Sequence, residues 1–489
     1  MSLSLAYDVA RSALSVAATA TSVVSRNVQN AGDANAARKS ADLATAANGG
    51  VYVAGISSSI NQALFDHVVE NSAEFSELQA ITTNLERLDQ VVGDPELGIN
   101  AAALIAELQS ALQVAAASPG DETMARIAIA RAEDLARAVN QAARVVSDVR
   151  NDADVAIGEA AVQLENLLAK FELLNNEVVN GTNAGRDVTD ANDSRNGVLR
   201  KISELIGVRA TVRGSNDIVL FAANGATLFE TVPRQITFSV TAPLAPGQNG
   251  SRFSIDGVPF SADEAGKLSG RIGGLMQVRD STATTLNRQL DELARGLITL
   301  FAEQDQSASP TLPDMPGLFT FSGGFVPPAG TVVDGLAALL RVNANVDPQQ
   351  GGVVTRLRDG GISVPGNPSY IYNATGGAGY SERLLGLQES LSGSIAFDPA
   401  AGLSDTANLR SFASQSAGWL SELRQSQAEK FDDKQVLGQR ALASWQDSIG
   451  INLDDELTAL IALERSYQAS SRLINSVNGM FDALLSATE

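Results

Sequence analysis

The two ends of the chain carry its most regular apolar rows. Near the start, apolar and small side chains recur in steps of three and four, and near the end they recur in steps of three, four or their sums. This spacing places side chains on one side of a helix and suits coiled-coil packing. We therefore predict terminal helices over 1–31 and about 452–487, whose rows form an assembly interface. The rows are Ala6, Val9, Ala13, Val16, Ala20 and Val23, and Leu453, Leu457, Leu460, Tyr467, Ile474, Phe481 and Leu485.

The N-terminal row is rich in small side chains, among them Ala6, Ala13 and Ala20, which permit close packing of several helices. Helices of this length and Ala content gain most of their stability from tertiary burial. We therefore expect each row to be covered by the other end or by further copies of the chain. A coiled coil that closes within a monomer is the alternative.

Helical spacing continues through most of the chain. The longest apolar period runs over 121–180, which exceeds a typical globular helix and indicates rod-like packing. Residues 32–50 lose the period and end in Asn-Gly-Gly, so we interpret them as a connector, and Val51–Ile56 is a short β-like run. Further helices are predicted over 57–92, 100–117, about 190–206, 264–305 and 404–447.

Two central stretches differ from the helical segments in their sequence pattern. Residues 208–260 alternate apolar and polar side chains between turn residues, which predicts a β unit. Residues 306–402 are rich in Gly and Pro and predict a second β or irregular unit that is exposed. The fold class is therefore mainly α with β insertions: a coiled coil of the N- and C-terminal helices, a helical-bundle rod domain and one or two central β-rich domains.

The predicted domains are nested along the chain, with the ends enclosing the rod and the rod enclosing the β units. They are a terminal coiled-coil assembly domain (1–31 plus 450–489), a helical rod domain (50–206 plus 264–305 plus 404–449), a β unit (207–263) and a Gly/Pro-rich outer domain (306–403).

Composition narrows the function classes. The formal net charge is −21, from 56 acids against 35 bases, which argues against nucleic acid and anionic membranes as partners. The chain has no cysteine, which excludes disulfides, thiolate chemistry and Cys-based zinc sites.

Two further features concern membranes and export. Because no apolar run reaches about 18 residues, we predict no membrane insertion. Asp8 and Arg11 interrupt the apolar pattern of residues 1–25, which lack a basic opening stretch, so we expect export without a cleaved signal peptide if the chain is exported.

Candidate chemical sites are few. His67 is the only histidine, so a two-His metal site is impossible. The stretch Asp190–Ser194 hints at a calcium loop, but Arg195 and Lys201 stand where that loop needs Gly and Glu, so we interpret it as a polar helix cap. The glycines at 270, 273, 274, 376, 377 and 379 lack the frame of a phosphate loop and are expected in turns or packing. Asp454, Asp455 and Glu456 suit the dipole of the last helix. We predict no catalytic residue, cofactor or metal.

Several segments together resemble the hook-associated members of the flagellar axial protein family, over nearly the whole chain except about 306–402. The most specific is Asn452–Leu457, followed by Tyr467–Ser470, Arg472–Ile474 and Met480–Leu484. The others are Gly50–Ile56, Asp190–Asp193 with Arg195, Ile202–Val208, Gly270–Leu275, Arg279 with Asp280, and Leu286–Leu293. The Asn-Thr-Pro-Gly-Tyr-like element usual in that family is replaced by Asn30–Asn35.

The resemblance implies a structural subunit of the bacterial flagellum that joins hook to filament and self-assembles through its terminal helices. It implies as partners further copies of the chain, the hook protein, the second junction protein and an export chaperone on the C-terminal helix, and an extracellular location reached by type III export. Another axial protein (hook-associated protein 3 or a flagellin), a wall hydrolase and a non-flagellar helical scaffold are the alternatives.

Overall fold

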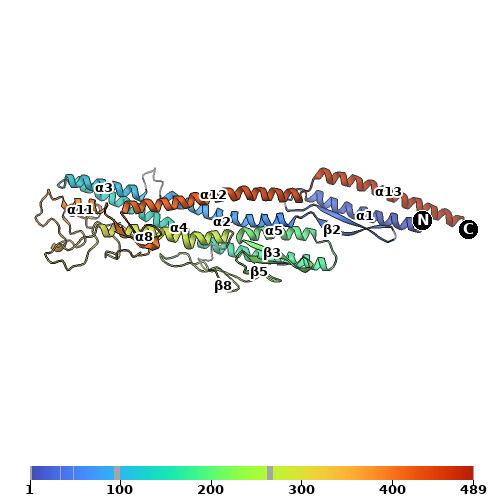
Figure 1. Cartoon of the computed structure of the whole chain (residues 1–489), viewed down its shortest axis with the longest axis horizontal. Helices are drawn as coiled ribbons and strands as arrows, with labels where there is room; N and C mark the ends of the chain where they lie inside the picture. The colour runs from blue at the N-terminus through green and yellow to red at the C-terminus, as the bar shows by residue number, and fades with distance from the viewer. Residues whose placement is uncertain (1–2, 34, 48, 93–99, 261–267, 488–489) are drawn as a thin grey trace.

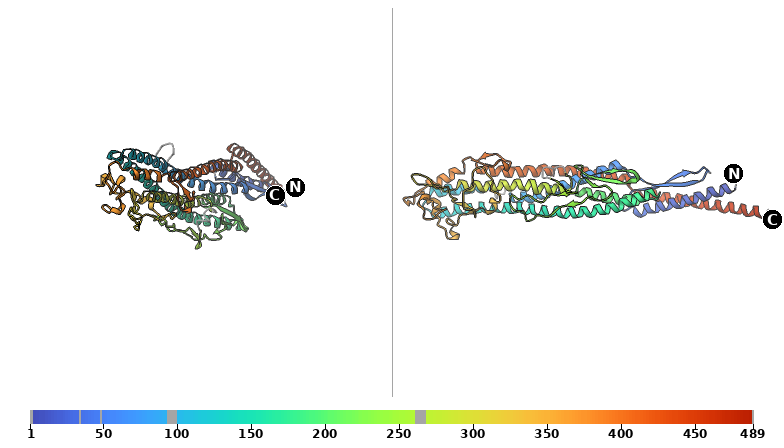
Figure 2. Two further views of the ribbon diagram at one scale, coloured as in Figure 1. Left: turned by 60° about the vertical axis from the view of Figure 1, so that its left-hand side comes forward. Right: turned by 90° about the horizontal axis from the view of Figure 1, so that it is seen from below.

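The computed structural model of the chain describes residues 3–33, 35–47, 49–92, 100–260 and 268–487. It is a long rod of helices that run along the rod axis, with both termini at one end (Figure 1). Small sheets lie against the helices, and the view from below in Figure 2 shows the same narrow outline. The predicted class, mainly α with β insertions and a terminal coiled coil, is confirmed.

The longest helix, α4 (Glu122–Asn183), is the backbone of the rod and confirms the helix predicted over 121–180. It begins where the side chain of Asp121 accepts a hydrogen bond from the backbone N–H of Thr123, which satisfies a free N–H group of the first turn. Its buried side chains repeat at helical spacing along nearly its whole length, because other helices surround it. Its neighbours are α2 (Gln62–Val92), α3 (Ala101–Ala117), α5 (Thr189–Leu205), α7 (Arg271–Gln277) and α8 (Ala283–Leu300).

Two of the predicted rod helices begin later than the sequence indicated. α7 follows Gly270, whose φ of 90° lies in the region that favours glycine, and continues through a π-helical turn (Val278–Thr282) into α8. Of the predicted helix over 264–305, positions 264–267 lie outside the described residues. α12 (Leu409–Ile449) follows a short strand, β12 (Thr406–Ala407), that pairs with β11 (Ile395–Ala396).

The N-terminal region differs from the prediction in one element. α1 (Leu3–Asn30) is the expected helix, but the interpretation of 32–50 as a plain connector is wrong. Lys39–Thr45 forms strand β1, which pairs antiparallel with β2 (Val51–Ser58). We call this two-stranded hairpin the ribbon. Because β2 extends to Ser58, α2 starts at Gln62 rather than 57.

The predicted β unit consists of two small antiparallel sheets on the side of the rod. One has the order β3-β4-β5 and the other β6-β7-β8. Gly158 of α4 allows the second to approach, since a Cβ there would lie 2.6 Å from Cγ2 of Val240. The strands are Val208–Val212, Ile218–Ala222, Thr227–Phe229, Ile236–Thr237, Ser254–Ile255 and Val258–Pro259.

The Gly/Pro-rich stretch is mostly irregular, and it covers the end of the rod opposite the termini (Figure 1). Its regular pieces are short: a two-stranded sheet of β9 (Phe319–Thr320) and β10 (Arg341–Val342), and the helices α9 (Leu336–Leu339), α10 (Arg356–Asp359) and α11 (Glu382–Ser390). The domain boundaries given above stay predictions.

Candidate assembly interface

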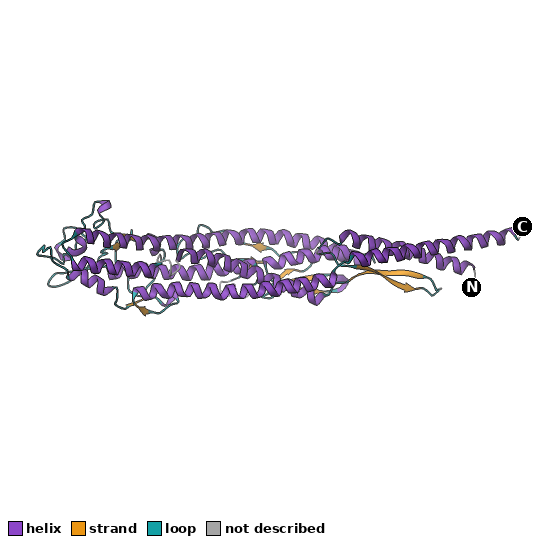
Figure 3. Ribbon diagram, turned by 90° about the horizontal axis from the view of Figure 1, so that it is seen from above, coloured by secondary structure: helices purple, strands orange, loops and turns teal. Residues whose placement is uncertain are grey.

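The two terminal helices pack antiparallel as a coiled coil. α13 (Leu453–Ser486) runs beside α1 and extends past its start, so the two chain ends project from the rod (Figures 1 and 3). The small side chains of Ala10 and Ala17 are almost fully buried, which allows the close approach that Ala-rich faces permit. On α13, a row of buried or half-buried side chains recurs in steps of three, four or seven residues: Glu456, Leu460, Leu463, Ser470, Ile474 and Val477.

The structure covers only part of the predicted interface. On α1, Val23 is buried, and Ala6, Val9, Ala13, Val16 and Ala20 are half-buried. On α13, Leu460 and Ile474 are half-buried in the seam. The other five predicted residues remain exposed: Leu453 (47%), Leu457 (47%), Tyr467 (46%), Phe481 (37%) and Leu485 (66%).

The seam of α13 is therefore rotated from the predicted row. The sequence analysis missed Glu456, Leu463 and Val477, which face α1 or its neighbours, and it missed the exposed Ile461, Leu473 and Met480. The signal was hidden because a Glu and a Ser occupy positions that a coiled coil normally fills with apolar side chains.

The outward faces of the two helices differ in character. On α1, the exposed positions 8, 11, 15, 18, 22, 25 and 29 recur in threes and fours and hold Asp, Arg, Ser, Ala, Ser, Ser and Gln. On α13, large apolar side chains are exposed beside the seam. One chain thus gives α1 a polar outer surface and leaves α13 with apolar surface in contact with solvent.

Glu456 forms a buried polar joint where the coil meets the rod. Its Oε2 accepts from Asn27 Nδ2 (3.0 Å) and its Oε1 from Arg38 Nε (2.6 Å). The backbone N–H of Arg38 donates to Ile449 O at the end of α12 (2.8 Å). Glu456 is 0% exposed, so its carboxylate has a specific role beyond the helix-dipole role predicted for it. The side chain of Asn452 caps α13 by accepting from the N–H of Asp454.

A second set of ion pairs fastens α1 and the ribbon to α5. Arg26 pairs with Asp187 (2.7 Å) and Asp190 (3.1 Å), and buried Lys39 pairs with Asp190 and with Asp193. Asp190 and Asp193 therefore do not cap α5 as predicted: Asp187 accepts from the N–H of Thr189 instead.

The surroundings of two of these carboxyl groups shift their pKa values in opposite directions. Burial raises the pKa of Asp193, although Lys39 counteracts it. For Asp187, burial is outweighed by the hydrogen bonds from Thr189 and by Arg26, which hold its pKa below the ordinary value.

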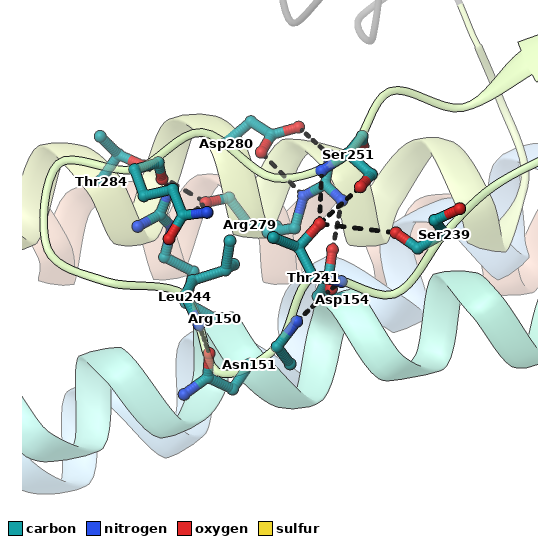
Figure 4. A network of polar contacts seen from close by, with 12 residues as sticks. Arg150, Asn151, Asp154, Ser239, Thr241, Leu244, Ser251, Arg279, Asp280 and Thr284 are labelled. Carbon is teal, nitrogen blue, oxygen red and sulfur yellow. Dashed lines mark hydrogen bonds and ion pairs between the residues drawn. The ribbon is translucent and has the colours of Figure 1, made fainter.

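A buried network at the π-helical turn holds the β unit on the rod (Figure 4). Arg279, 1% exposed, donates to Asp154 of α4 (2.6 Å), to both oxygens of Asp280 (2.8 and 2.7 Å) and to the carbonyl of Ser251 (3.0 Å). The other oxygen of Asp154 accepts from the backbone N–H of Thr241 (2.6 Å). Buried charges are tolerated when they are paired in this way.

Buried acids of α8 and the residues after it hold the Gly/Pro-rich stretch. Asp291 accepts from the backbone N–H groups of Gly335 and Ala337, and burial raises its pKa to about 7. Glu303 accepts from the N–H of Ile362 and pairs with Arg383 (2.8 Å). These bonds explain how a stretch with little regular structure keeps a defined path.

The remaining candidates of the sequence analysis have structural roles. His67 is exposed on α2, 4.0 Å from Glu70. A Cβ on Gly274 would lie 2.5 Å from the carbonyl oxygen of Glu77, so this glycine allows α7 to pack on α2, and Gly376 (φ 67°) lies in a turn. Among the described residues, no group of three or more His, Cys, Asp or Glu could hold a metal ion. Over the same residues, no helix combines the length and apolar character needed to span a bilayer.

Two family models match the chain. One, described as the helical domain of flagellar hook-associated protein FlgK, matches residues 85–312, and the other, described as the C-terminal part of the flagellar basal body rod FlgEFG proteins, matches 448–487. The first runs from the last turns of α2 through α8, and the second spans α13.

Flagellar hook-associated protein 1 of Salmonella typhimurium is 25% identical over 313 residues, which are 60% of this chain and 55% of that protein. The match thus spans about half the length of that relative. The protein of the same name from Escherichia coli K12 is 21% identical over 97% of this chain and 98% of its own length. The flagellar hook junction protein FlgK from Burkholderia pseudomallei superposes with a TM-score of 0.44 and 20% identity, over 53% of this chain and 47% of that one. The family models and these relatives together support the resemblance of the chain to flagellar hook-associated protein 1.

Proposed function

We propose that the chain is a structural subunit of the bacterial flagellum that joins hook to filament and assembles through its terminal helices. The observation that supports this most is the uncovered apolar surface of α13, with Leu453, Leu457 and Ile461 about half exposed in the single chain. At about 25 cal/mol per Å², covering such side chains in an assembly favours association. The names of the relatives, which place them at the hook, agree with this role.

The proposal assigns different tasks to the two ends of the rod. The coil supplies contacts among copies in an inner tube, where burial offsets the entropy of ordering the helices. The rod and the β units face outward and set the spacing between copies. The hook protein and the second junction protein are the proposed neighbours, and no catalytic step is part of the role.

Export completes the proposal. We infer passage through a type III system to the extracellular flagellum without a cleaved signal peptide. An export chaperone would cover the exposed apolar residues of α13 before assembly.

Deletion of residues 452–489 tests the proposal. In cells whose only copy lacks this segment, we expect short or absent filaments and filament subunits shed into the medium. A matched pair of full-length variants separates assembly from folding. Leu453→Ser with Leu457→Ser should give the same phenotype as the deletion, and Arg465→Ser with Arg472→Ser, at two exposed charged positions of α13, should not. Normal filaments in the deletion strain would refute the proposal.

A further inference from the structure

The terminal coil leaves apolar surface uncovered at two separate places. One is the row Leu453, Leu457 and Ile461 on α13, whose side chains are 47%, 47% and 52% exposed. Steps of four residues align them along one side of the helix. The other is the half of the ribbon nearest its turn, where Leu43 is 57% and Tyr52 is 51% exposed. Both places contain large apolar side chains in the part of the molecule that the proposed function assigns to assembly.

The pairing of the ribbon places these two side chains on opposite faces. Leu43 lies opposite Val53, and the next pair along is Ala44 with Tyr52. Because directly paired residues share a face and successive residues alternate, Leu43 and Tyr52 point to different sides. α1 packs against the ribbon but leaves a large apolar side chain exposed on each face. A ribbon of this kind has room for a second neighbour besides its own α1.

The position of α1 prevents one chain from joining the two surfaces. α1 lies between α13 and the ribbon in the views from the side and from above (Figures 1 and 3). The backbone N–H of Val51 donates to Ser12 Oγ (3.2 Å), which fixes the far end of the ribbon on α1. The ribbon and α13 are therefore held on separate flanks of the same helix.

We propose that the face of the ribbon carrying Leu43, in the half nearest its turn, docks on the row Leu453, Leu457 and Ile461 of a second copy of the chain. This inference rests on the proposed self-assembly and adds an element to it, since that assembly was assigned to the terminal helices alone. A second copy of the chain fits this site best, because each copy carries both surfaces. The ribbon of one copy then covers the row on α13 of the next. Two different surfaces that meet in this way make a heterologous contact, which generates a ring or a helical array.

Polar side chains confine the contact to one half of the ribbon. Near the joint, Ser40 and Ser57 lie with their hydroxyl oxygens 3.1 Å apart, and Ser57 donates to Asp42 (2.9 Å). These side chains are hydrogen-bonded to one another and close to the ion pairs of Lys39. They remain solvated in the proposed contact, and the apolar half beyond them enters it.

Cysteine crosslinking tests the contact, because the chain has no cysteine of its own. Flagella are isolated from cells that produce full-length chain with Leu43→Cys and Ile461→Cys, oxidised, and run on a denaturing gel without reductant. We expect a series of dimers and larger multimers from this double variant. Each single variant should run as a monomer, and Val53→Cys with Leu457→Cys, as an independent pair on the same face of the ribbon as Leu43, should also give multimers.

Two further pairs serve as controls. Ser40→Cys with Ser57→Cys should form a disulfide within one chain, which verifies the oxidation. Leu43→Cys with Ser22→Cys, on the polar outward face of α1, should give monomers.

Monomers from both test pairs, in flagella that contain the variant chains and in which the Ser40/Ser57 pair is oxidised, would overturn the inference and leave the proposed function intact. Dimers from Leu43→Cys alone would overturn it as well, since they indicate a symmetric contact. Absence of even the unmodified chain from flagella would refute the proposed function itself.

Discussion

The rod and the terminal coil are built from similar amphipathic helices, but only the rod covers its apolar rows within one chain. In α4, Leu135, Leu164 and Phe171 are all 0% exposed, because helices surround α4 along its length. In α13, Val477 is the apolar residue that is buried among those described, and Leu453 and Leu457 remain half exposed. The difference lies in the number of neighbours, since a helix in a two-helix coil covers only one side.

The polar groups of the two regions differ in the same way. In the rod, Arg279 and Asp154 are 1% and 0% exposed and form a closed network. In the joint, buried Glu456 pairs with Arg38, whose side chain is 45% exposed. The network around Arg279 is therefore shielded from salt, and the Glu456–Arg38 pair of the joint is one that water can reach.

The largest expected effect comes from breaking the rod network. Arg279→Met should lower the free energy of unfolding by about 3–5 kcal/mol, because the buried charge of Asp154 loses its counterion. Arg213→Met, which breaks the surface pair with Asp217, is the matched control and should cost less than about 1 kcal/mol. Urea unfolding of the two variants measures the difference, and equal losses would contradict the assignment of a buried role.

A matched pair of leucines compares the two regions directly. Leu164→Ala in α4 should destabilise the monomer by about 2–5 kcal/mol, since it leaves a cavity in a packed core. Leu457→Ala in α13 should change monomer stability by less than about 0.5 kcal/mol and reduce incorporation into flagella. Thermal unfolding and quantitation of the chain in isolated flagella measure both. A large loss of monomer stability for Leu457→Ala would show that the coil is completed within one chain.

The rod also contains a buried acid, Glu77, whose deprotonation should lower the free energy of unfolding. Burial, with a smaller effect of Glu74, raises the pKa of Glu77 from 4.5 to about 7. The folded state therefore holds this proton more tightly than the unfolded state. The stabilisation that the protonated Glu77 provides is fully present below about pH 4.5 and is lost as the pH rises through 7. Glu77→Gln should raise stability at pH 8 by on the order of 1–3 kcal/mol and change it little at pH 4. Urea titrations at both pH values test this, and an equal effect at both would contradict it.

A smaller effect than in the rod network is expected at the joint. Glu456→Gln keeps the shape but removes the charge that pairs with Arg38, at a cost of about 1–2 kcal/mol. The loss should appear as faster amide exchange in α1 and α13 without a change in α4. Slower folding or exchange changes centred on α4 would place Glu456 in the rod rather than in the joint.

The helices could be predicted from the sequence because their apolar periods are long and their ends are marked. α4 begins and ends close to the prediction, and α13 starts at the Asn452 cap. The second strand of the ribbon was predicted as the β-like run Val51–Ile56. The first strand was missed because β1, Lys-Ser-Ala-Asp-Leu-Ala-Thr, has little β-propensity of its own and forms by pairing with β2.

The interface was half predictable for a different reason. The row that includes Leu460 and Ile474 was found, but the seam also uses Glu456, whose partners Asn27 and Arg38 are more than 400 residues away in sequence. Long-range polar pairing of this kind leaves no periodic signal. Asp291 of α8 and Glu303 after it, which hold the Gly/Pro-rich stretch, could not be recognised for the same reason, because their partners include backbone N–H groups far away in sequence.

Hydrogen exchange on the dilute full-length chain tests the central claim most directly. If the coil is completed only by further copies, amides of residues 5–28 and 457–485 should exchange far faster than those of α4 and become protected in assembled flagella. Protection of these segments in the dilute monomer equal to that of α4 would contradict the account.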